Sequence, residues 1–258
     1  MSKPLIFVTN DDGIAAPGMR ALIEVAKEFG EVIVVAPDKA QSGMGHAITI
    51  NNTIRVNEVK IDADIKEWSC TGTPVDCVKL AVNMILHRKP DLLLSGINHG
   101  PNSSISVIYS GTMSAAVEGA IEGIPSIGFS LYDYSVNADF TLAKSVVKTM
   151  IDNVLNNGLP DGICLNVNIP MIGKEEFKGI KICRQAKAIW DEEFDERKDP
   201  YGNKYYWMAG SLRNQDDGED TDVSALSQHY ASVVPVQFDL TAHQVIKDLK
   251  NWTYEVKL

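Results

Sequence analysis

Residues 5–13 have the sequence LIFVTNDDG, an apolar run that ends in two adjacent carboxylates, Asp11 and Asp12, and a glycine. A run rich in branched and aromatic residues and closed by turn-formers predicts a strand buried in a parallel sheet. Ligands of open α/β sheets bind beyond the carboxyl ends of such strands. Two like charges repel each other there, and a divalent cation supplies the positive charge that keeps both ionised. The alternative is a helix N-cap with a neighbouring surface acid.

The alternation of strand and helix patterns continues from residue 1 to about residue 185. It predicts an α/β fold with a doubly wound sheet and right-handed crossovers, and a core domain over 1–185. The expected strands are 5–9, 32–36, 91–95, 126–130 and 163–168, and the expected helices are 18–29, 74–87, 112–122 and 138–156. Short runs at 47–50, 53–59 and 67–70 predict a small antiparallel extension.

The remaining region, 186–258, is polar and aromatic. A Pro/Gly/Asn turn between two aromatic-containing runs predicts a long β-hairpin arm. We expect a short helix at 222–228, a further apolar run at 231–238 and a helix at 242–250. The arm either folds back on its own domain or contacts another subunit, and exposed rings favour the subunit contact. The rings are Trp190, Phe194, Tyr201, Tyr205, Tyr206 and Trp207.

Composition limits the class of protein. At 258 residues and 45% hydrophobic, the chain can bury the core of one large domain with an appendage. The formal net charge of -10 argues against a nucleic-acid polymer as partner, although a small phosphorylated substrate stays compatible if a metal reverses the local field. The four cysteines lack CxxC spacing, no signal peptide precedes the first strand, and no apolar run approaches about 18 residues. We therefore expect a cytoplasmic protein with no membrane partner.

Oxygen-bearing residues follow two further predicted strands. Ser42 comes after the strand at 32–36, and Asn98 comes after the strand at 91–95. Each residue alone is explained more simply as part of a turn. Together with Asp11 and Asp12, however, they offer the carboxylate, hydroxyl and amide oxygens that Mg²⁺ accepts.

Two segments are suited to an anion. Glycines at 43 and 45 allow backbone N–H groups to approach it closely, whereas His46 beside them is explained more simply as a hydrogen-bonded loop residue. Ser110 and Thr112 stand where a helix of small residues begins, and the free N–H groups of a helix N-terminus form a phosphate seat. N-capping by either hydroxyl is compatible with that role. Neither segment matches a Walker loop or the dinucleotide fingerprint.

Five ordered blocks resemble the SurE family of metal-dependent nucleotidases, which act as phosphatases on nucleoside monophosphates. The blocks are TNDDGI with APG at 9–18, APD with QSG and GH at 36–46, GTP with DCV at 72–78, SGIN at 95–98 and YSGT at 109–112, with a looser match at 221–235. The resemblance implies a Rossmann-like three-layer α/β/α sandwich whose subunits pair through exchanged C-terminal elements. It implies one divalent ion, Mg²⁺ or Mn²⁺, on Asp11, Asp12, Ser42 and Asn98.

The same resemblance supplies the remaining site assignments. The implied catalytic residues are Asp11, Asp12 and Asn98, and the implied substrate-binding residues are Asn10, Gly43, Gly45, His46, Ser110, Gly111 and Thr112. The chain departs from the family in one place. Where the family usually has Asn-x-Gly-x-Asp or Asn, this chain has serine at 104 and 106 after Asn102, which removes the basis for giving those two positions a substrate role.

The expected activity is hydrolysis of nucleoside 5'-monophosphates with broad base tolerance, extending to 3'-monophosphates and short polyphosphate, by a homodimer or homotetramer. The alternative is a nucleotide-binding regulatory protein that uses the same pocket without turnover. The Asp-x-Asp nucleophile spacing of haloacid-dehalogenase-type phosphatases is absent after the first strand, where Asp11 and Asp12 are adjacent. Whether Asp11 attacks phosphorus or only holds the ion stays open at this point.

Overall fold

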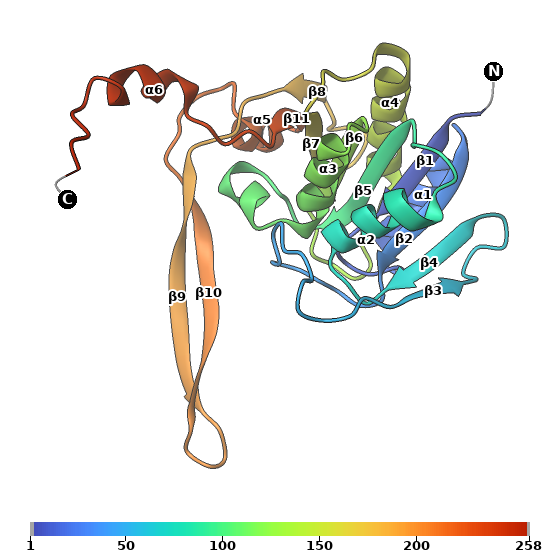
Figure 1. Cartoon of the computed structure of the whole chain (residues 1–258), viewed down its shortest axis with the longest axis horizontal. Coiled ribbons are helices and arrows are strands. Elements are labelled where there is room, and N and C mark those ends of the chain that lie inside the picture. Colours follow the sequence, from blue (N-terminus) through green and yellow to red (C-terminus); the bar gives the residue numbers. More distant parts are fainter. Residues whose placement is uncertain (1–2, 257–258) are drawn as a thin grey trace.

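The computed structural model describes residues 3–256, which form one large sheet with helices on both faces and a two-stranded arm (Figure 1). Within these residues the sheet has nine strands, in the order β3-β4-β2-β1-β5-β6-β7-β11-β8. Their bounds are β1 (Leu5–Thr9), β2 (Glu31–Pro37), β3 (Val56–Val59), β4 (Lys66–Cys70), β5 (Leu92–His99), β6 (Ser126–Leu131), β7 (Ile163–Ile169), β8 (Gly179–Ile182) and β11 (Tyr230–Gln237). The helices are α1 (Pro17–Ala26), α2 (Pro74–Leu80), α3 (Gly111–Ile121), α4 (Thr141–Asn157), α5 (Asp222–Ser227) and α6 (His243–Leu249).

The centre of the sheet is parallel. β4, β2, β1, β5, β6 and β7 run in one direction, whereas β11 is antiparallel to β7 and parallel to β8. Helices cover both faces, as expected for a strand that is apolar on both sides. In β1, Ile6 and Val8 pack toward α1 and α4, and Phe7 packs toward α2 on the other face. The predicted doubly wound, three-layer α/β/α fold is therefore confirmed.

The extension before α2 differs from the prediction. Residues 47–50 form no strand, because Thr49 instead hydrogen-bonds the carboxylate of Asp76 through its backbone nitrogen (3.0 Å) and its hydroxyl (2.6 Å). Asp76 also completes the capping box of α2 with Thr73. β3 occupies only the last part of the run expected at 53–59. It pairs antiparallel with β4, but β4 is parallel to β2, so the extension is mixed.

Several elements differ in extent from the prediction, two of them by more than three residues, and β8 was not predicted. The helix expected at 74–87 is α-helical only to Leu80 and then continues as a π-helical turn, Ala81–Ile85. β5 continues past the predicted end at residue 95 to His99, which places Asn98 inside the strand. β8 is a four-residue strand of mixed polarity, too short for a periodic pattern to be recognised in the sequence.

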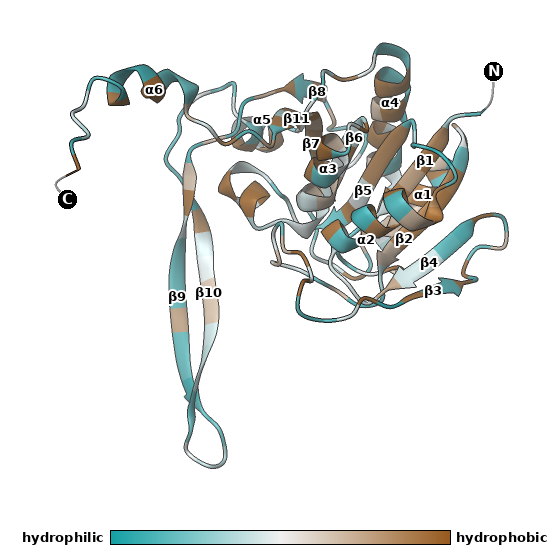
Figure 2. Ribbon diagram, viewed as in Figure 1, coloured by the Kyte–Doolittle hydropathy of each residue, from teal (hydrophilic) through white to brown (hydrophobic). Residues whose placement is uncertain are grey.

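The arm consists of β9 (Ala188–Lys198) and β10 (Lys204–Asn214), which pair antiparallel along their whole length. The predicted hairpin is confirmed, and it projects far from the sheet (Figure 1). Figure 2 shows short apolar bands on otherwise polar strands. At its tip, the carboxylate of Asp199 accepts hydrogen bonds from the backbone nitrogens of Tyr201 and Asn203, both at 2.9 Å. Five of the six rings named above are exposed, whereas Trp190 at the base is half-buried.

The C-terminal region contributes to both the sheet and the periphery. β11 lies between β7 and β8 in the central sheet, while α6 lies apart from the sheet (Figure 1). The division of the chain at residue 185 stays a prediction. Among the helices of residues 3–256, none combines the length and the apolar character that a crossing of the bilayer requires.

We propose that the chain forms at least a dimer through the arm and the C-terminal segment, because exposed rings on a projecting hairpin lack a partner surface within their own subunit. Light scattering at micromolar concentration tests this. We expect a mass of two or four chains for the full chain and a lower mass after Phe194→Asp, which places a charge among the exposed rings. The mass of a single chain for the unaltered protein would contradict the proposal.

Candidate active site

The two carboxylates lie directly after β1, in the loop that leads to α1. Asp11 is 4% exposed, and the Thr112 hydroxyl donates to Asp11 Oδ1 at 2.5 Å. Asp12 is half-buried, and the backbone N–H of His99 donates to Asp12 Oδ2 at 3.4 Å. Across residues 3–256, no Lys or Arg forms an ion pair with either carboxylate. The negative charge at this edge of the sheet is therefore not balanced by a basic side chain.

Burial changes the acidity of both groups. Desolvation raises the pKa of Asp11 from 3.8 to about 6, although the hydrogen bond from Thr112 opposes this rise and the charge of Asp12 adds to it. Burial also raises the pKa of Asp12, and the backbone hydrogen bond from His99 opposes that rise. A bound cation would reverse both shifts, because it favours the ionised form.

The N-terminus of α3 abuts Asp11. A Cβ on Gly111 would lie 2.7 Å from Asp11 Cβ and 2.9 Å from Asp11 Oδ2, so a side chain at this position would push the helix away. Ser110 caps the helix by accepting a hydrogen bond from the Met113 nitrogen at 3.0 Å. The free N–H groups and the positive end of the helix dipole therefore lie beside the carboxylates, as an anion seat requires.

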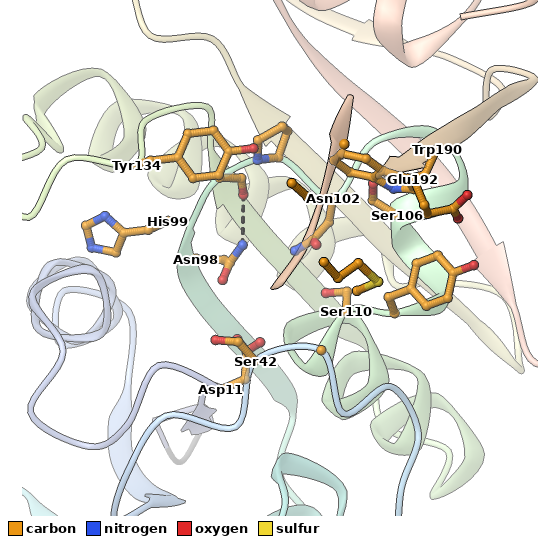
Figure 3. Close-up of a pocket in the computed structure, with 17 residues that line it drawn as sticks. Asp11, Ser42, Asn98, His99, Asn102, Ser106, Ser110, Tyr134, Trp190 and Glu192 are labelled. Atoms are coloured by element: carbon orange, nitrogen blue, oxygen red, sulfur yellow. Dashed lines mark hydrogen bonds between the residues drawn. The ribbon is translucent and has the colours of Figure 1, made fainter. Parts of the chain in front are cut away.

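A cavity of about 730 Å³ joins the loops after β1, β2 and β5 to the start of α3. Five residues singled out from the sequence line one part of it: Asp11, Ser42, Gly43, Asn98 and Ser110. The amide nitrogen of Asn98 donates to the Gly100 carbonyl at 2.8 Å, and Figure 3 shows the amide oxygen turned toward Asp11 and Ser42. Thr112 lies behind Asp11 as its hydrogen-bond donor, and Asp12 does not line the cavity.

Five residues assigned to substrate lie outside the cavity lining: Gly111 and Thr112 lie beside Asp11, and the other three hold the loops around the cavity. Asn10 is buried and donates to the Gly13 carbonyl at 3.0 Å. The Gly45 nitrogen donates to the Tyr109 carbonyl at 3.2 Å, which ties the loop after β2 to the segment before α3. His46 Nε2 lies 2.8 Å from Glu118 Oε2. Their substrate roles stay predictions.

Glu118 anchors the loop that carries Ser42 and Gly43. Its carboxylate is 1% exposed and also accepts a hydrogen bond from Lys79. Burial tends to raise the pKa of Glu118, but the hydrogen bonds from His46 and Lys79 outweigh burial and hold that pKa below its usual range. Glu118 therefore stays ionised and keeps both partners in place.

The serines that depart from the family pattern have separate roles. Ser104 has a φ of 53°, in the left-handed region that favours glycine, which accounts for the usual family residue. Its nitrogen donates to Asp222 Oδ2 at 2.7 Å and its hydroxyl to the Ala186 carbonyl at 2.9 Å, so it links α5 to the segment before the arm. Ser106 lines the cavity.

Sequence reasoning missed the far wall of the cavity. It includes Tyr134 from the loop after β6 and Trp190 and Glu192 from the arm (Figure 3), and Met208 of the arm also lines the cavity. The hairpin pattern identifies the two strands of the arm. Nothing in the sequence of β9 itself indicates that the base of the arm lies over the carboxyl edge of the sheet. The half-buried state of Trp190 marks this contact.

The oxygen-bearing side chains at and around Asp11 suit a hard divalent cation. Asp11, Asp12, Ser42 and Asn98 offer only oxygen atoms, which Mg²⁺ and Mn²⁺ accept. In the part of the chain that the structure describes, no cluster of three or more His, Cys, Asp or Glu residues forms an alternative metal site.

The site and fold together define a class: an α/β protein with unpaired carboxylates and a helix N-terminus at the edge of a parallel sheet. The family model "Survival protein SurE" matches residues 6–192, and the chain belongs to this family. It is 65% identical to "5'-nucleotidase SurE" of Christiangramia forsetii over 97% of both chains, and 64% identical to the protein of that name from Flavobacterium psychrophilum over 98% of both. The crystal structure of the SurE protein from Aquifex aeolicus superposes with a TM-score of 0.82, at 44% identity, over 96% of this chain and 98% of that one.

The raised pKa of Asp11 predicts a pH dependence of stability in the metal-free protein. The folded state holds this proton up to about pH 6, whereas a carboxyl with the ordinary pKa of 3.8 releases it earlier. The unfolded state therefore binds fewer protons between these values, and the free energy of unfolding falls by about 3 kcal/mol as pH rises through them. Denaturant titrations from pH 3.5 to 7.5 measure this fall.

Asp11→Asn is the matched control, because it keeps the shape and an oxygen that accepts from Thr112 but cannot titrate. We expect this variant to lack the fall that Asp11 causes. An identical pH slope in the two proteins would show that Asp11 is not the titrating group.

Proposed function

We propose that the chain is a metal-dependent phosphomonoesterase that hydrolyses nucleoside 5'-monophosphates to nucleoside and phosphate. One observation carries the proposal: within residues 3–256, two carboxylates without a basic partner lie beside an approaching helix N-terminus, and Asp11 of this pair lines one end of a cavity. The name 5'-nucleotidase, carried by relatives that match nearly the whole chain, supports the nucleotide as substrate.

In this proposal, Asp11, Asp12, Ser42 and Asn98 hold one Mg²⁺ or Mn²⁺ ion. When bound, such an ion supplies positive charge that stabilises the phosphoryl oxygens and makes water more acidic. Asn98 is oriented for its role, because its amide nitrogen is committed to the Gly100 carbonyl and its oxygen remains free. Asp11 Oδ1 is committed to Thr112, so Oδ2 is the oxygen with free capacity.

The chain's own groups provide the rest of the mechanism. The free N–H groups at the start of α3 and the Ser110 side chain bind phosphoryl oxygens, where negative charge is stabilised during transfer. The loop at Gly43 supplies further donors from the opposite side. We assign Asp11 to the role of ligand, with water as the nucleophile, because the Thr112 hydrogen bond and the approach of Gly111 hold its carboxylate in place.

Recognition centred on phosphate implies tolerance of the rest of the substrate. We therefore propose activity on several bases, extending to 3'-monophosphates and short polyphosphate. The net charge of -10 supports a small substrate rather than a nucleic-acid polymer. The proposed setting is the cytoplasm, which suits four buried free thiols.

Phosphate release from AMP, GMP and related esters tests the activity. We expect release with Mg²⁺ or Mn²⁺, loss of activity after exhaustive chelation with EDTA, and recovery when the metal is restored. Full activity after chelation would remove the metal from the mechanism. Measurable nucleotide binding without release from any ester, with metal present, would favour the regulatory alternative.

Asp12→Asn tests the proposed ligand directly. Loss of one negative charge should weaken Mn²⁺ binding at least about tenfold, since even changes beyond the ligands act on that scale. Asp38→Asn is the matched control, because Asp38 is an exposed acid just after β2 and does not line the cavity. Calorimetry with Mn²⁺ measures both variants. Because the N-cap of α1 is Ala16 and no side chain caps the helix, Asp12 is not an N-cap, and equal affinities for Asp12→Asn and the unaltered chain would remove Asp12 from the ligands.

A further inference from the structure

The cavity is much larger than a phosphate group needs. Its volume of about 730 Å³ lies within the range of pockets that enclose whole cofactors or drug-sized ligands. The polar groups of the proposed phosphate end, Asp11, Ser42 and Ser110, occupy one side of it (Figure 3). The rest of the cavity is therefore available to the part of the substrate that is not phosphate.

The arm directs one strand face into this space. Side chains alternate along a strand, so Trp190 and Glu192 of β9 share a face, and both line the cavity. Asp191 between them points away and pairs with Arg213, with nitrogen–oxygen distances of 2.6 and 2.9 Å. This ion pair therefore lies on the face of the arm that is turned away from the cavity.

The second strand of the arm leaves room beside the indole. Gly210 pairs with Glu192 across the hairpin and carries no side chain, and Ala209 before it carries only a methyl group. Met208 completes this side of the lining with a flexible apolar chain. Leu212 is the residue directly opposite Trp190, but it does not line the cavity, so on the cavity side a flat ring against Trp190 meets Met208, Ala209 and Gly210 instead.

Tyr134 provides an aromatic surface from the main domain. Its ring lies against Gly100, where a Cβ would be 2.3 Å from Tyr134 Cε1. It also packs edge-on against Tyr132, with ring centroids 6.5 Å apart. These contacts border part of the ring, and the rest of Tyr134, in the loop after β6, is exposed and accessible to a ligand. Figure 3 shows Tyr134 and Trp190 on the side of the cavity away from Asp11 and Ser42.

We propose that Trp190 is a specificity-determining residue that stacks on the base of the nucleotide, with Tyr134 as the second aromatic surface. The proposal rests on the proposed function, because it takes the phosphate to be held at the Asp11 end. Every base has a π-face, so stacking provides affinity for nucleotides without selecting one base. Stacking therefore explains why several bases would be accepted. It also favours a nucleotide over a phosphate ester that has no base.

The test compares AMP with ribose 5-phosphate, which carries the same phosphate and sugar but no base. Trp190→Ala should lower kcat/KM for AMP roughly 5- to 100-fold, the range of one base–aromatic stack, and leave ribose 5-phosphate within about twofold. Trp190→Phe should recover most of the loss. Ile189→Ala is the matched control, because Ile189 precedes Trp190 on the same strand and does not line the cavity.

Binding provides a second readout that does not depend on turnover. Calorimetry with AMP and with ribose 5-phosphate, in the presence of Mn²⁺, should show the same selective loss for Trp190→Ala. If no ester is hydrolysed but this selective loss of AMP binding persists, the proposed reaction fails while the base site stands. Equal losses for both ligands, or none for AMP, would overturn the assignment of Trp190, including when hydrolysis proceeds.

Discussion

The structure depends on one electrostatic constraint: two adjacent carboxylates, one of them buried, are held together without a basic partner among residues 3–256. The parallel sheet creates the constraint, because the chain leaves β1 at the carboxyl edge where the neighbouring strands β2 and β5 also end. The fold raises the pKa of Asp11 rather than neutralising it with Lys or Arg. Such an arrangement lowers the free energy of unfolding unless a proton or a cation is bound. Groups with perturbed pKa values are typical of functional sites, which α/β proteins place at the carboxyl edge of the sheet.

Neighbouring residues adapt to these carboxylates. Gly111 lets the start of α3 reach Asp11, and Thr112 fixes the orientation of the carboxylate. Glu118, two turns along the same helix, holds His46 and through it the loop that carries Ser42. One helix therefore positions a carboxylate, an anion seat and a candidate ligand loop. A small shift of α3 would affect all three together. The small residues of α3 allow it to pack closely, and this packing opposes such a shift.

The sequence predicts two kinds of feature. One is the secondary structure that follows from local residue patterns, and the other is the group of side chains at strand ends that share one edge of the sheet. β1 and its neighbours are recognisable because apolar residues on both faces require burial on both faces. Asp11 and Ser42 follow the adjacent strands β1 and β2, and Asn98 lies near the end of β5 on the other side of β1, so all three reach the same edge of the sheet. The run at 47–50 fails as a strand because Asp76, distant in sequence, hydrogen-bonds Thr49. Trp190 is visible in the sequence as part of a hairpin, but a hairpin pattern specifies pairing between two strands and not the surface on which they dock.

The arm thereby has two faces with different surroundings. The outer face of β9 carries the Asp191–Arg213 pair, whereas the inner face at its base brings Trp190 and Glu192 to the cavity. Further along, rings such as Phe194 and Trp207 are exposed on the projecting hairpin.

The most direct test of the electrostatic account is an anomalous difference map from crystals grown with Mn²⁺ and without chelator. We expect one strong peak per chain, which marks an ion coordinated by oxygens of Asp11, Asp12, Ser42 and Asn98. The distances expected for such an ion, about 2.1 Å for a small hard cation, would identify direct ligands. No peak between the two carboxylates at saturating Mn²⁺, or a lysine or arginine side chain in that place, would contradict it.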